Sequence, residues 1–298
     1  MDVERIADLA KGLDCFFSRT EPLARHLSLG IGGAPAFYLR PRAWHQAEGI
    51  FLALWEGNAE FRVLGGGSNL MAADGPLSFG VVHLARLGGH MRWEGNSVEA
   101  DADVPMPALA GESVRRGLGG LEGMGGIPGT VGGAVVMNAG AFGNDISGVL
   151  AGVALIEPGR GMTWRPASDF AFAYRGSDVA RAGVLAGCRL TFTPEDPRKL
   201  RARFEEAKAS RDTTQPWRSA TAGSVFKNPP GKAAGRILDE LGYKGKRRGA
   251  AGFSALHANF LVNHGGATFE DAFGLCEEAR LAASGAGVTL EYEMEIWR

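Results

Sequence analysis

The sequence predicts a mixed α and β fold with ligand-binding loops at strand ends, followed by a small α+β domain. Three observations support this prediction. Short apolar strand segments alternate with helical segments over the first two thirds of the chain. Glycine supplies 45 of the 298 residues, about twice its average share, and no low-complexity tract accounts for the excess. The last third ends with an amphipathic helix and an alternating strand.

The individual elements follow from local signals in the sequence. After a helical or irregular lead-in over residues 1–25, a glycine turn leads into a strand that Pro41 stops. Prolines at 105 and 107 fit the first turn of a helix that stops at Gly117. Thr268 and Asp271 have the spacing of a capping box. Further helices are expected at 44–55, 199–211, 233–241 and 268–283, and strands at 61–64, 81–100 (two strands and a turn), 149–157, 162–165, 184–193, 257–263 and 288–297.

The most unusual stretch runs from Gly125 to Gly143. It contains too much glycine for a helix and too little alternation for an ordinary strand. Glycine permits positive φ and a close approach of the backbone to a ligand. We expect a rigid loop whose N–H groups face a phosphate or the polar edge of a ring, as in a backbone nest. From this stretch alone, a glycine-rich connection in a β domain is nearly as good an interpretation.

A second glycine loop follows the predicted strand at 61–64. This strand leads directly into Gly65–Asn69, and the end of a strand is a common place for a phosphate. The third glycine of the dinucleotide fingerprint is missing here, and Gly30-x-Gly32 ends at Pro35. A Gly-x-x-x-x-Gly-Lys-Ser/Thr loop is also missing. Neither the Rossmann nor the P-loop pattern is therefore satisfied.

Composition narrows the class of partner. The formal net charge of -1 and a pI near 6.6 give no electrostatic reason to expect nucleic acid or an anionic membrane. No signal-peptide pattern is present, and no apolar run approaches the ~18 residues of a membrane helix. The three cysteines (Cys15, Cys188 and Cys276) lie far apart, as expected for buried thiols in a reducing compartment without a disulfide. We expect a cytoplasmic monomer that binds a small molecule and no metal.

Eight segments match one family pattern, in order and over nearly the whole chain. They are Ile31–Gly33, Leu64–Leu70, Gly126–Ala134, Asn138–Gly143, Tyr174–Ser177, Gly223–Pro229, His257–Asn263 and Leu290–Glu293. The chain thereby resembles the UDP-N-acetylenolpyruvoylglucosamine reductase (UDP-N-acetylmuramate dehydrogenase) family. It is similar to the shorter, type II subgroup, because the stretch from Arg175 to Gly223 is too short for the tyrosine-bearing loop of another subgroup. The chain departs from the family pattern at Gly30, Gly176 and Leu256.

This resemblance implies an α+β fold with a two-part FAD-binding region of the vanillyl-alcohol-oxidase/PCMH type and a small α+β substrate-binding domain. The implied domains are 1–75 and 76–196 for FAD, and 197–298 for substrate, with the terminal strand returning to the flavin site. The implied reaction is the NADPH-dependent reduction of UDP-N-acetylglucosamine enolpyruvate to UDP-N-acetylmuramate through FAD, in peptidoglycan precursor synthesis. The implied FAD contacts are Gly65, Gly66, Gly67, Ser68, Asn69, Gly126, Ile127, Pro128, Gly129, Thr130, Gly133, Asn138, Ala139, Gly140 and Ala141.

The resemblance also selects three catalytic residues. Arg175 can hold a carboxylate with two parallel hydrogen bonds, and a structural ion pair is the alternative. Ser224 would give a proton to carbon, although by itself it reads as a turn or cap residue. Glu293 alternates with two other glutamates on a predicted strand, a pattern that alone indicates a solvated edge. In the family's reaction it would be a protonated donor to the enolate-like intermediate.

Four other residues belong to matched motifs. Tyr174, Lys227 and Asn228 are implied to contact the substrate, with ordinary surface roles as the alternative. His257 is more consistent with a packed, hydrogen-bonded structural histidine than with a catalytic one. Two other functions compete with the reductase: an FAD-dependent oxidase or dehydrogenase of a small hydroxylated substrate, and a non-catalytic flavin-binding protein. The first leaves the Gly223–Pro229 motif unexplained, and the intact catalytic candidates argue against the second.

Overall fold

The computed structural model describes residues 2–298, which divide into two compact units. The first unit comprises the chain up to residue 19 together with 36–66 and 79–209, and the second comprises 20–35, 67–78 and 210–298. Two short N-terminal segments thus pack with the C-terminal part of the chain. The three domains expected from the sequence (1–75, 76–196 and 197–298) are defined by the ligand that each would bind, whereas the two units are defined by their internal contacts. The three-domain division stays a prediction.

The first unit begins with a four-stranded sheet. Its strand β3 leads into the glycine loop that starts at Gly65. Its strand order is β1-β2-β5-β3, with β2, β5 and β3 parallel and β1 antiparallel. Helices α1 and α2 share an apolar core with this sheet that includes Ile6, Leu39 and Phe51. The predictions for the helix at 44 and the strand at 61 are confirmed. The bounds are α1 Val3–Gly12, β1 Phe16–Ser18, β2 Tyr38–Arg40, α2 Trp44–Glu56, β3 Phe61–Leu64 and β5 Gly80–His83.

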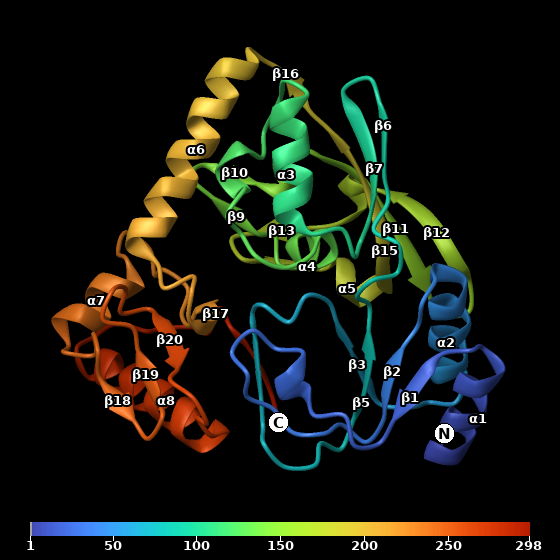
Figure 1. Ribbon diagram of the computed structural model, residues 1–298, viewed down its shortest axis with the longest axis horizontal. Helices are drawn as coiled ribbons and strands as arrows, with labels where there is room; N and C mark the ends of the chain where they lie inside the picture. The colour runs from blue at the N-terminus through green and yellow to red at the C-terminus, as the bar shows by residue number, and fades with distance from the viewer. Residues whose placement is uncertain (1) are drawn as a thin grey trace. The chain divides into compact units, whose positions relative to one another are not determined.

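A five-stranded antiparallel sheet forms the rest of the first unit. Its order is β12-β11-β15-β7-β6. Alternate residues of β11 enter two different cores: Val153 and Leu155 pack with α3 and α4, whereas Ala154 and Ile156 pack with α2. The sheet is therefore buried on both faces, and α3 and α4 lie against it in Figure 1. The bounds are β6 Met91–Glu94, β7 Ser97–Asp101, α3 Met106–Arg115, α4 Val131–Val136, β11 Leu150–Glu157, β12 Gly161–Pro166 and β15 Val184–Thr191.

Helix α4 corrects one expectation. The stretch from Gly125 to Gly143 was expected to be too rich in glycine for a helix, and this is wrong for Val131–Val136. Thr130 caps the helix through its side chain, and Val131, Ala134 and Val135 are buried in the core. Tertiary packing therefore overrides the low helix propensity of the two glycines in α4.

Short elements outside the main sheets lie in both units, and several of them carry predicted site residues. They are η1 Leu23–Arg25 in the second unit and, in the first, β8 Leu118–Gly119, η2 Glu122–Met124, β9 Gly140–Ala141, β10 Asn144–Asp145, η3 Ile146–Gly148, η4 Ala167–Asp169, β13 Phe172–Ala173, β14 Gly176–Ser177, α5 Val179–Ala182 and β16 Thr193–Pro194.

The second unit is built on a four-stranded antiparallel sheet in the order β17-β20-β19-β18. Helices α7 and α8 share its apolar core, and the predicted cap of α8 is confirmed, because Thr268 Oγ1 accepts a hydrogen bond from Asp271 N–H. The expected terminal strand is regular only at its end, where β21 pairs with the short β4. The bounds are β4 Leu70–Ala72, β17 Ala220–Ser224, α7 Ala234–Glu240, β18 Arg247–Arg248, β19 Ala251–Phe253, β20 Phe260–Asn263, α8 Phe269–Gly285 and β21 Glu295–Trp297.

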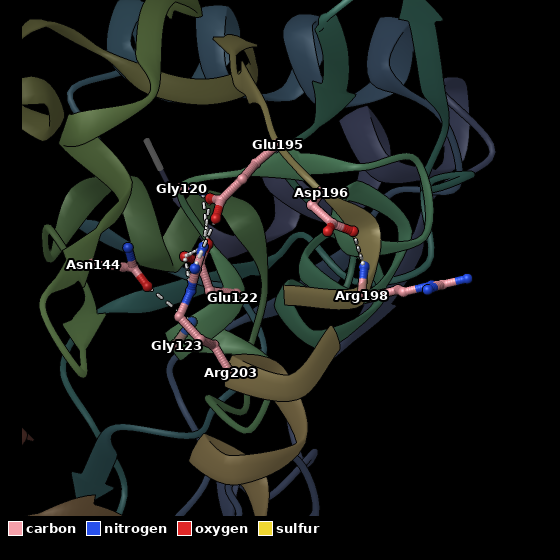
Figure 2. Close-up of polar contacts among 8 residues, drawn as sticks. All are labelled: Gly120, Glu122, Gly123, Asn144, Glu195, Asp196, Arg198 and Arg203. Carbon is pink, nitrogen blue, oxygen red and sulfur yellow. Dashed lines mark hydrogen bonds and ion pairs between the residues drawn. The ribbon is translucent and has the colours of Figure 1, made fainter. Parts of the chain in front are cut away.

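Helix α6 (Pro197–Thr214) is joined by an ion pair to the segment that precedes the glycine-rich stretch Gly125–Gly143. The Arg203 guanidinium lies 2.9 Å from a carboxylate oxygen of Glu122 in η2 and 2.6 Å from one of Glu195 (Figure 2). Burial acts to raise the pKa of Glu122, but hydrogen bonds from the Gly120 N–H and from Arg203 outweigh it and hold that pKa below its ordinary value. The ion pair therefore stabilises the charged carboxylate next to Gly125.

We expect Arg203→Met to lower the free energy of unfolding by about 1–3 kcal/mol at neutral pH, because buried Glu122 loses its charged partner. The folded-state pKa of Glu122 is lowered, so this stabilisation is present above the unfolded-state pKa of about 4.3 and is lost as the pH falls through the folded-state value. Urea unfolding from neutral pH to about pH 3 measures the difference. Arg198→Met, an exposed position on the same helix, is the matched control. A difference that does not shrink in acid would contradict this account.

Candidate active site

The two glycine loops touch each other in the first unit. A Cβ atom on Gly66 would lie 2.8 Å from the Cα of Gly129, and one on Gly65 would lie 3.0 Å from Thr130 Oγ1. Real Cβ atoms do not approach that closely, so Gly66 must be glycine for the loops to meet. Gly129 itself has φ +102°, a value that disfavours any side chain. The loops therefore form one continuous backbone surface.

This surface carries N–H groups that the protein does not use. Across residues 2–298, the N–H groups of Gly65, Gly66, Gly129 and Thr130 donate to no protein acceptor. Gly66 is exposed and the other three are half-buried. Free N–H donors on neighbouring stretches of glycine backbone are groups that can bind phosphate oxygens. The observed cradle thus fits the phosphate-bearing part of a dinucleotide.

The N-terminus of α4 is not part of this donor set. Val131 and Gly132 N–H donate to the carbonyl oxygens of Val104 and Ala102, each at 2.8 Å. Gly133 N–H donates to Thr130 Oγ1 at 3.4 Å. The orphan N–H groups of the first helical turn are therefore satisfied internally. A bound anion would meet the two loops rather than the end of the helix.

The other predicted cofactor residues have varied surroundings. Gly67 has φ +64°, and a Cβ there would collide with the carbonyl oxygen of His26, so glycine is required. Asn69 Nδ2 donates to the carbonyl oxygen of Glu293 at 2.9 Å, both in the second unit. Gly126 and Pro128 are exposed. The remaining members (Ser68, Ile127, Ala139 and Ala141) are half-buried, and Gly140 is buried in the β9–β10 pair.

Asn138 is buried and has its side chain committed to the protein. Its Nδ2 donates to the carbonyl oxygen of Ala173 at 3.0 Å, and its Oδ1 accepts from Ser147 N–H at 3.3 Å. Its φ of +44° is left-handed, a conformation that asparagine tolerates better than most residues. The Asn138 side chain therefore has a structural role in linking two neighbouring segments of the protein.

Arg175 lies at the tip of a two-residue hairpin turn in the first unit. Strands β13 and β14 pair Ala173 with Gly176, which leaves Tyr174 and Arg175 in the turn. Arg175 has φ +58°, a left-handed conformation that costs roughly 1–2 kcal/mol for a residue with a side chain. Its guanidinium lies 4.9 Å from the centre of the exposed Tyr174 ring, a cation–π contact. The two residues thus form a cationic, aromatic tip.

Ser224 lies at a β-bulge in the second unit. Thr221 pairs with Val262 and Ser224 pairs with Phe260, so β17 has an irregular register between these pairs. Gly223 has φ +77° at this irregularity. Bulges turn a side chain away from the regular alternation and are common beside active sites. The local backbone therefore specifies the direction of the Ser224 hydroxyl.

The segment after Ser224 runs antiparallel to the segment that contains Glu293. Glu293 N–H donates to the carbonyl oxygen of Val225 at 2.9 Å, and Lys227 N–H donates to that of Glu291 at 2.8 Å. The second unit therefore brings the Ser224, Lys227 and Glu293 positions together on two neighbouring segments. Asn228 is exposed, and its Oδ1 accepts from Ala234 N–H at the start of α7. The predicted contact of Asn228 with substrate stays a prediction.

Asn259 is a residue that the sequence did not single out. It is buried, its Oδ1 accepts from Phe226 N–H at 3.0 Å, and its Nδ2 donates to the Phe226 carbonyl oxygen at 2.8 Å. Its side-chain amide thus makes the two hydrogen bonds to Phe226 that the backbone of a neighbouring strand would otherwise make, directly after Ser224 and Val225. The available signal was a polar amide inside an apolar strand segment, because such a group needs internal partners.

His257 and the cysteines have structural surroundings. His257 Nδ1 accepts from Asn259 N–H at 3.2 Å, its ring packs edge-on against Phe260, and burial lowers its pKa. The interpretation of His257 as a packed histidine is confirmed. All three cysteines are buried thiols, and burial raises the pKa of Cys15 to about 11. Within residues 2–298, no three potential metal-binding side chains come together, and no helix combines the length and apolarity needed to cross a membrane.

Comparison with known proteins identifies the family. The family model of the C-terminal domain of UDP-N-acetylenolpyruvoylglucosamine reductase matches residues 215–297, and an FAD-binding-domain model matches residues 35–164. The chain is 36% identical to the UDP-N-acetylenolpyruvoylglucosamine reductase of Moorella thermoacetica, over 100% of this chain and 99% of the relative. It is 38% identical to the Geobacter metallireducens protein of the same name, over 99% of each. The chain belongs to the UDP-N-acetylenolpyruvoylglucosamine reductase family.

Solved structures agree with this assignment. The reductase from Thermus caldophilus superposes with a TM-score of 0.82 at 32% identity, covering 95% of this chain and 100% of that one. An alkyldihydroxyacetonephosphate synthase superposes with a TM-score of 0.50 at 16% identity, over 65% of this chain and 41% of that one, which shows a shared fold alone. The predicted fold class is confirmed. As a member of this reductase family with an FAD-binding domain, the chain is an FAD-dependent oxidoreductase.

We expect Gly129→Val to release FAD before it unfolds the protein, because a branched side chain at φ +102° distorts the cradle. Gly159→Val is the matched control: Gly159 is also left-handed (φ +70°), and open space surrounds the position of a Cβ there. Flavin absorbance after gel filtration and circular dichroism check both variants. A folded Gly129→Val protein that keeps its full flavin content would contradict the role of this loop.

Proposed function

We propose that this chain reduces UDP-N-acetylglucosamine enolpyruvate to UDP-N-acetylmuramate with electrons from NADPH, a step of peptidoglycan precursor synthesis. The observation that carries the proposal is the local geometry of the second unit, in which Ser224 follows a bulge and the Glu293 segment hydrogen-bonds the next residue. The full-length relatives are named for the same enolpyruvyl substrate.

The substrate is an unreactive alkene until its carboxylate can take up negative charge. Bound FAD would supply the redox chemistry, with NADPH as the source of the hydride that is added to the terminal vinyl carbon. The planar guanidinium of Arg175 can hold the substrate carboxylate with two parallel hydrogen bonds. Such a cation stabilises the charge that develops as the hydride arrives. Tyr174, Lys227 and Asn228 supply further contacts to the sugar nucleotide.

The remaining step is a proton transfer to the adjacent carbon. Ser224 gives its hydroxyl proton to this carbon, which closes the balance of one hydride and one proton added across the double bond. A serine is a weak acid, but an enolate carbon is basic enough to accept its proton. Glu293, in its protonated form, donates a hydrogen bond to the enolate-like oxygen.

Anaerobic stopped-flow absorbance separates the two half-reactions. NADPH should bleach the flavin, and the enolpyruvyl sugar nucleotide should then restore the oxidised spectrum and yield one lactyl ether product for each flavin. Reduced flavin that is reoxidised by oxygen or an acceptor dye, but not by this substrate, would favour an oxidase or dehydrogenase. Flavin that NADPH does not reduce would favour a non-catalytic protein. Either result would overturn the proposal.

For Ser224→Ala, we expect reduction by NADPH at the parental rate and reoxidation by substrate slowed roughly 100-fold or more, because a positioned proton donor contributes about that much. Rapid-mixing absorbance measures both rates on one sample. Ser284→Ala, which changes an exposed serine at the end of α8, should leave both rates unchanged. Equal slowing of the two half-reactions in Ser224→Ala would count against a proton-donor role.

A further inference from the structure

The turn that carries Arg175 is held from both sides by the end of the glycine-rich stretch. On one side, Asn138 Nδ2 donates to the carbonyl oxygen of Ala173 at 3.0 Å. On the other, Ser177 Oγ lies 3.1 Å from the carbonyl oxygen of Val135 and 2.8 Å from that of Val136. These anchors come directly before and shortly after the two-residue turn. The backbone that presents Arg175 is therefore fixed at both ends.

Both anchors use the C-terminal end of α4. The last carbonyl groups of a helix lack the usual partners within it, and the single Ser177 hydroxyl proton is shared between two of them, those of Val135 and Val136. Asn138 follows the C-cap residue Met137 and adopts the left-handed conformation (φ +44°) that commonly ends a helix. The same asparagine thus ends α4 and, through its side chain, reaches the Arg175 turn.

The turn needs such anchors because its conformation is unfavourable by itself. Arg175 is left-handed at φ +58°, and residues with a side chain keep that conformation only where the surroundings hold it. The neighbouring Gly176 adds backbone freedom rather than restraint. Without Asn138 and Ser177, the turn could relax to conformations that point the guanidinium elsewhere.

We propose that Asn138 and Ser177 are positioning residues for Arg175: they hold its turn in the conformation that presents the guanidinium to the substrate carboxylate. This inference rests on the proposed function, because it takes Arg175 as the carboxylate-binding group. It gives the glycine-rich stretch a second role. The stretch forms the cofactor cradle ahead of α4 and holds the substrate-binding turn behind it, both within the first unit.

Two substitutions remove the anchors while sparing the backbone. Asn138→Gly deletes both side-chain hydrogen bonds, yet glycine still adopts φ +44° readily. Ser177→Ala deletes the hydroxyl, and Ser177→Thr restores it. Asn58→Gly is the matched control, because exposed Asn58 is also left-handed (φ +50°) after a helix. For both anchor deletions, we expect substrate reoxidation of the reduced flavin to slow roughly tenfold to a hundredfold, as for a misplaced catalytic group.

Three readouts distinguish positioning from general damage. For Ser177→Ala, the rate of flavin reduction by NADPH and the flavin content should stay at the parental level, whereas the substrate half-reaction slows. Ser177→Thr should recover most of the lost rate. In an Arg175→Ala background, Asn138→Gly should cause no further slowing of reoxidation, because the group that it positions is already gone. Equal slowing in the parental and Arg175→Ala backgrounds would overturn the inference.

The single variant Arg175→Ala separates this inference from the proposed function. If Arg175→Ala leaves reoxidation by substrate unchanged, the proposed role of Arg175 is wrong, and the inference falls with it. If Arg175→Ala slows reoxidation but Asn138→Gly and Ser177→Ala do not, the role of Arg175 stands and the inference alone is wrong. If Asn138→Gly does not fold, Ser177→Ala and its threonine rescue decide the outcome.

Discussion

The backbone contact between Gly66 and Gly129 is the constraint on which the candidate cofactor site of the first unit depends. No side chain fits between these residues, so the end of strand β3 and the loop before α4 meet as bare backbone. This contact explains why glycine is concentrated in two stretches that lie far apart in the sequence. It also explains how a chain without a Rossmann or P-loop pattern can offer free N–H groups to a dinucleotide, because the donors come from two loops rather than from one fingerprint.

Helix α4 lies between that contact and the turn that carries Arg175, the proposed carboxylate-binding residue. Its N-terminal N–H groups are used by the loop after β7, which holds the helix against the five-stranded sheet. Its C-terminal carbonyls and Asn138 hold the Arg175 turn. A helix of six residues, fixed at both ends, thus relates the cofactor cradle to the cationic tip. In the second unit, the bulge at Gly223 and the hydrogen bond from Phe226 N–H to Asn259 Oδ1 fix the backbone on either side of Ser224.

Much of the fold could be predicted from the sequence, because local signals dominate where strands and helices are regular. Strand β3 and the cap of α8 follow from apolar runs and from the spacing of Thr268 and Asp271. Helix α4 was missed, since its stability comes from burial and a threonine cap rather than from propensity. The Gly66–Gly129 contact and the Phe226 partner of the Asn259 amide could not be predicted, because each joins segments that are distant in sequence. The family motifs located the candidate site residues, whereas their hydrogen-bond partners required the structure.

The central claim is that the two touching glycine loops form the FAD site. Amide hydrogen exchange, measured residue by residue on the protein with and without FAD, tests it most directly. The N–H groups of Gly65, Gly66, Gly129 and Thr130 donate to no acceptor within residues 2–298, so they should exchange rapidly without FAD. Bound FAD should slow their exchange, while the α4 amides of Val131 and Gly132, already hydrogen-bonded, change little. Exchange at the four loop amides that is equally fast with and without FAD would contradict the account.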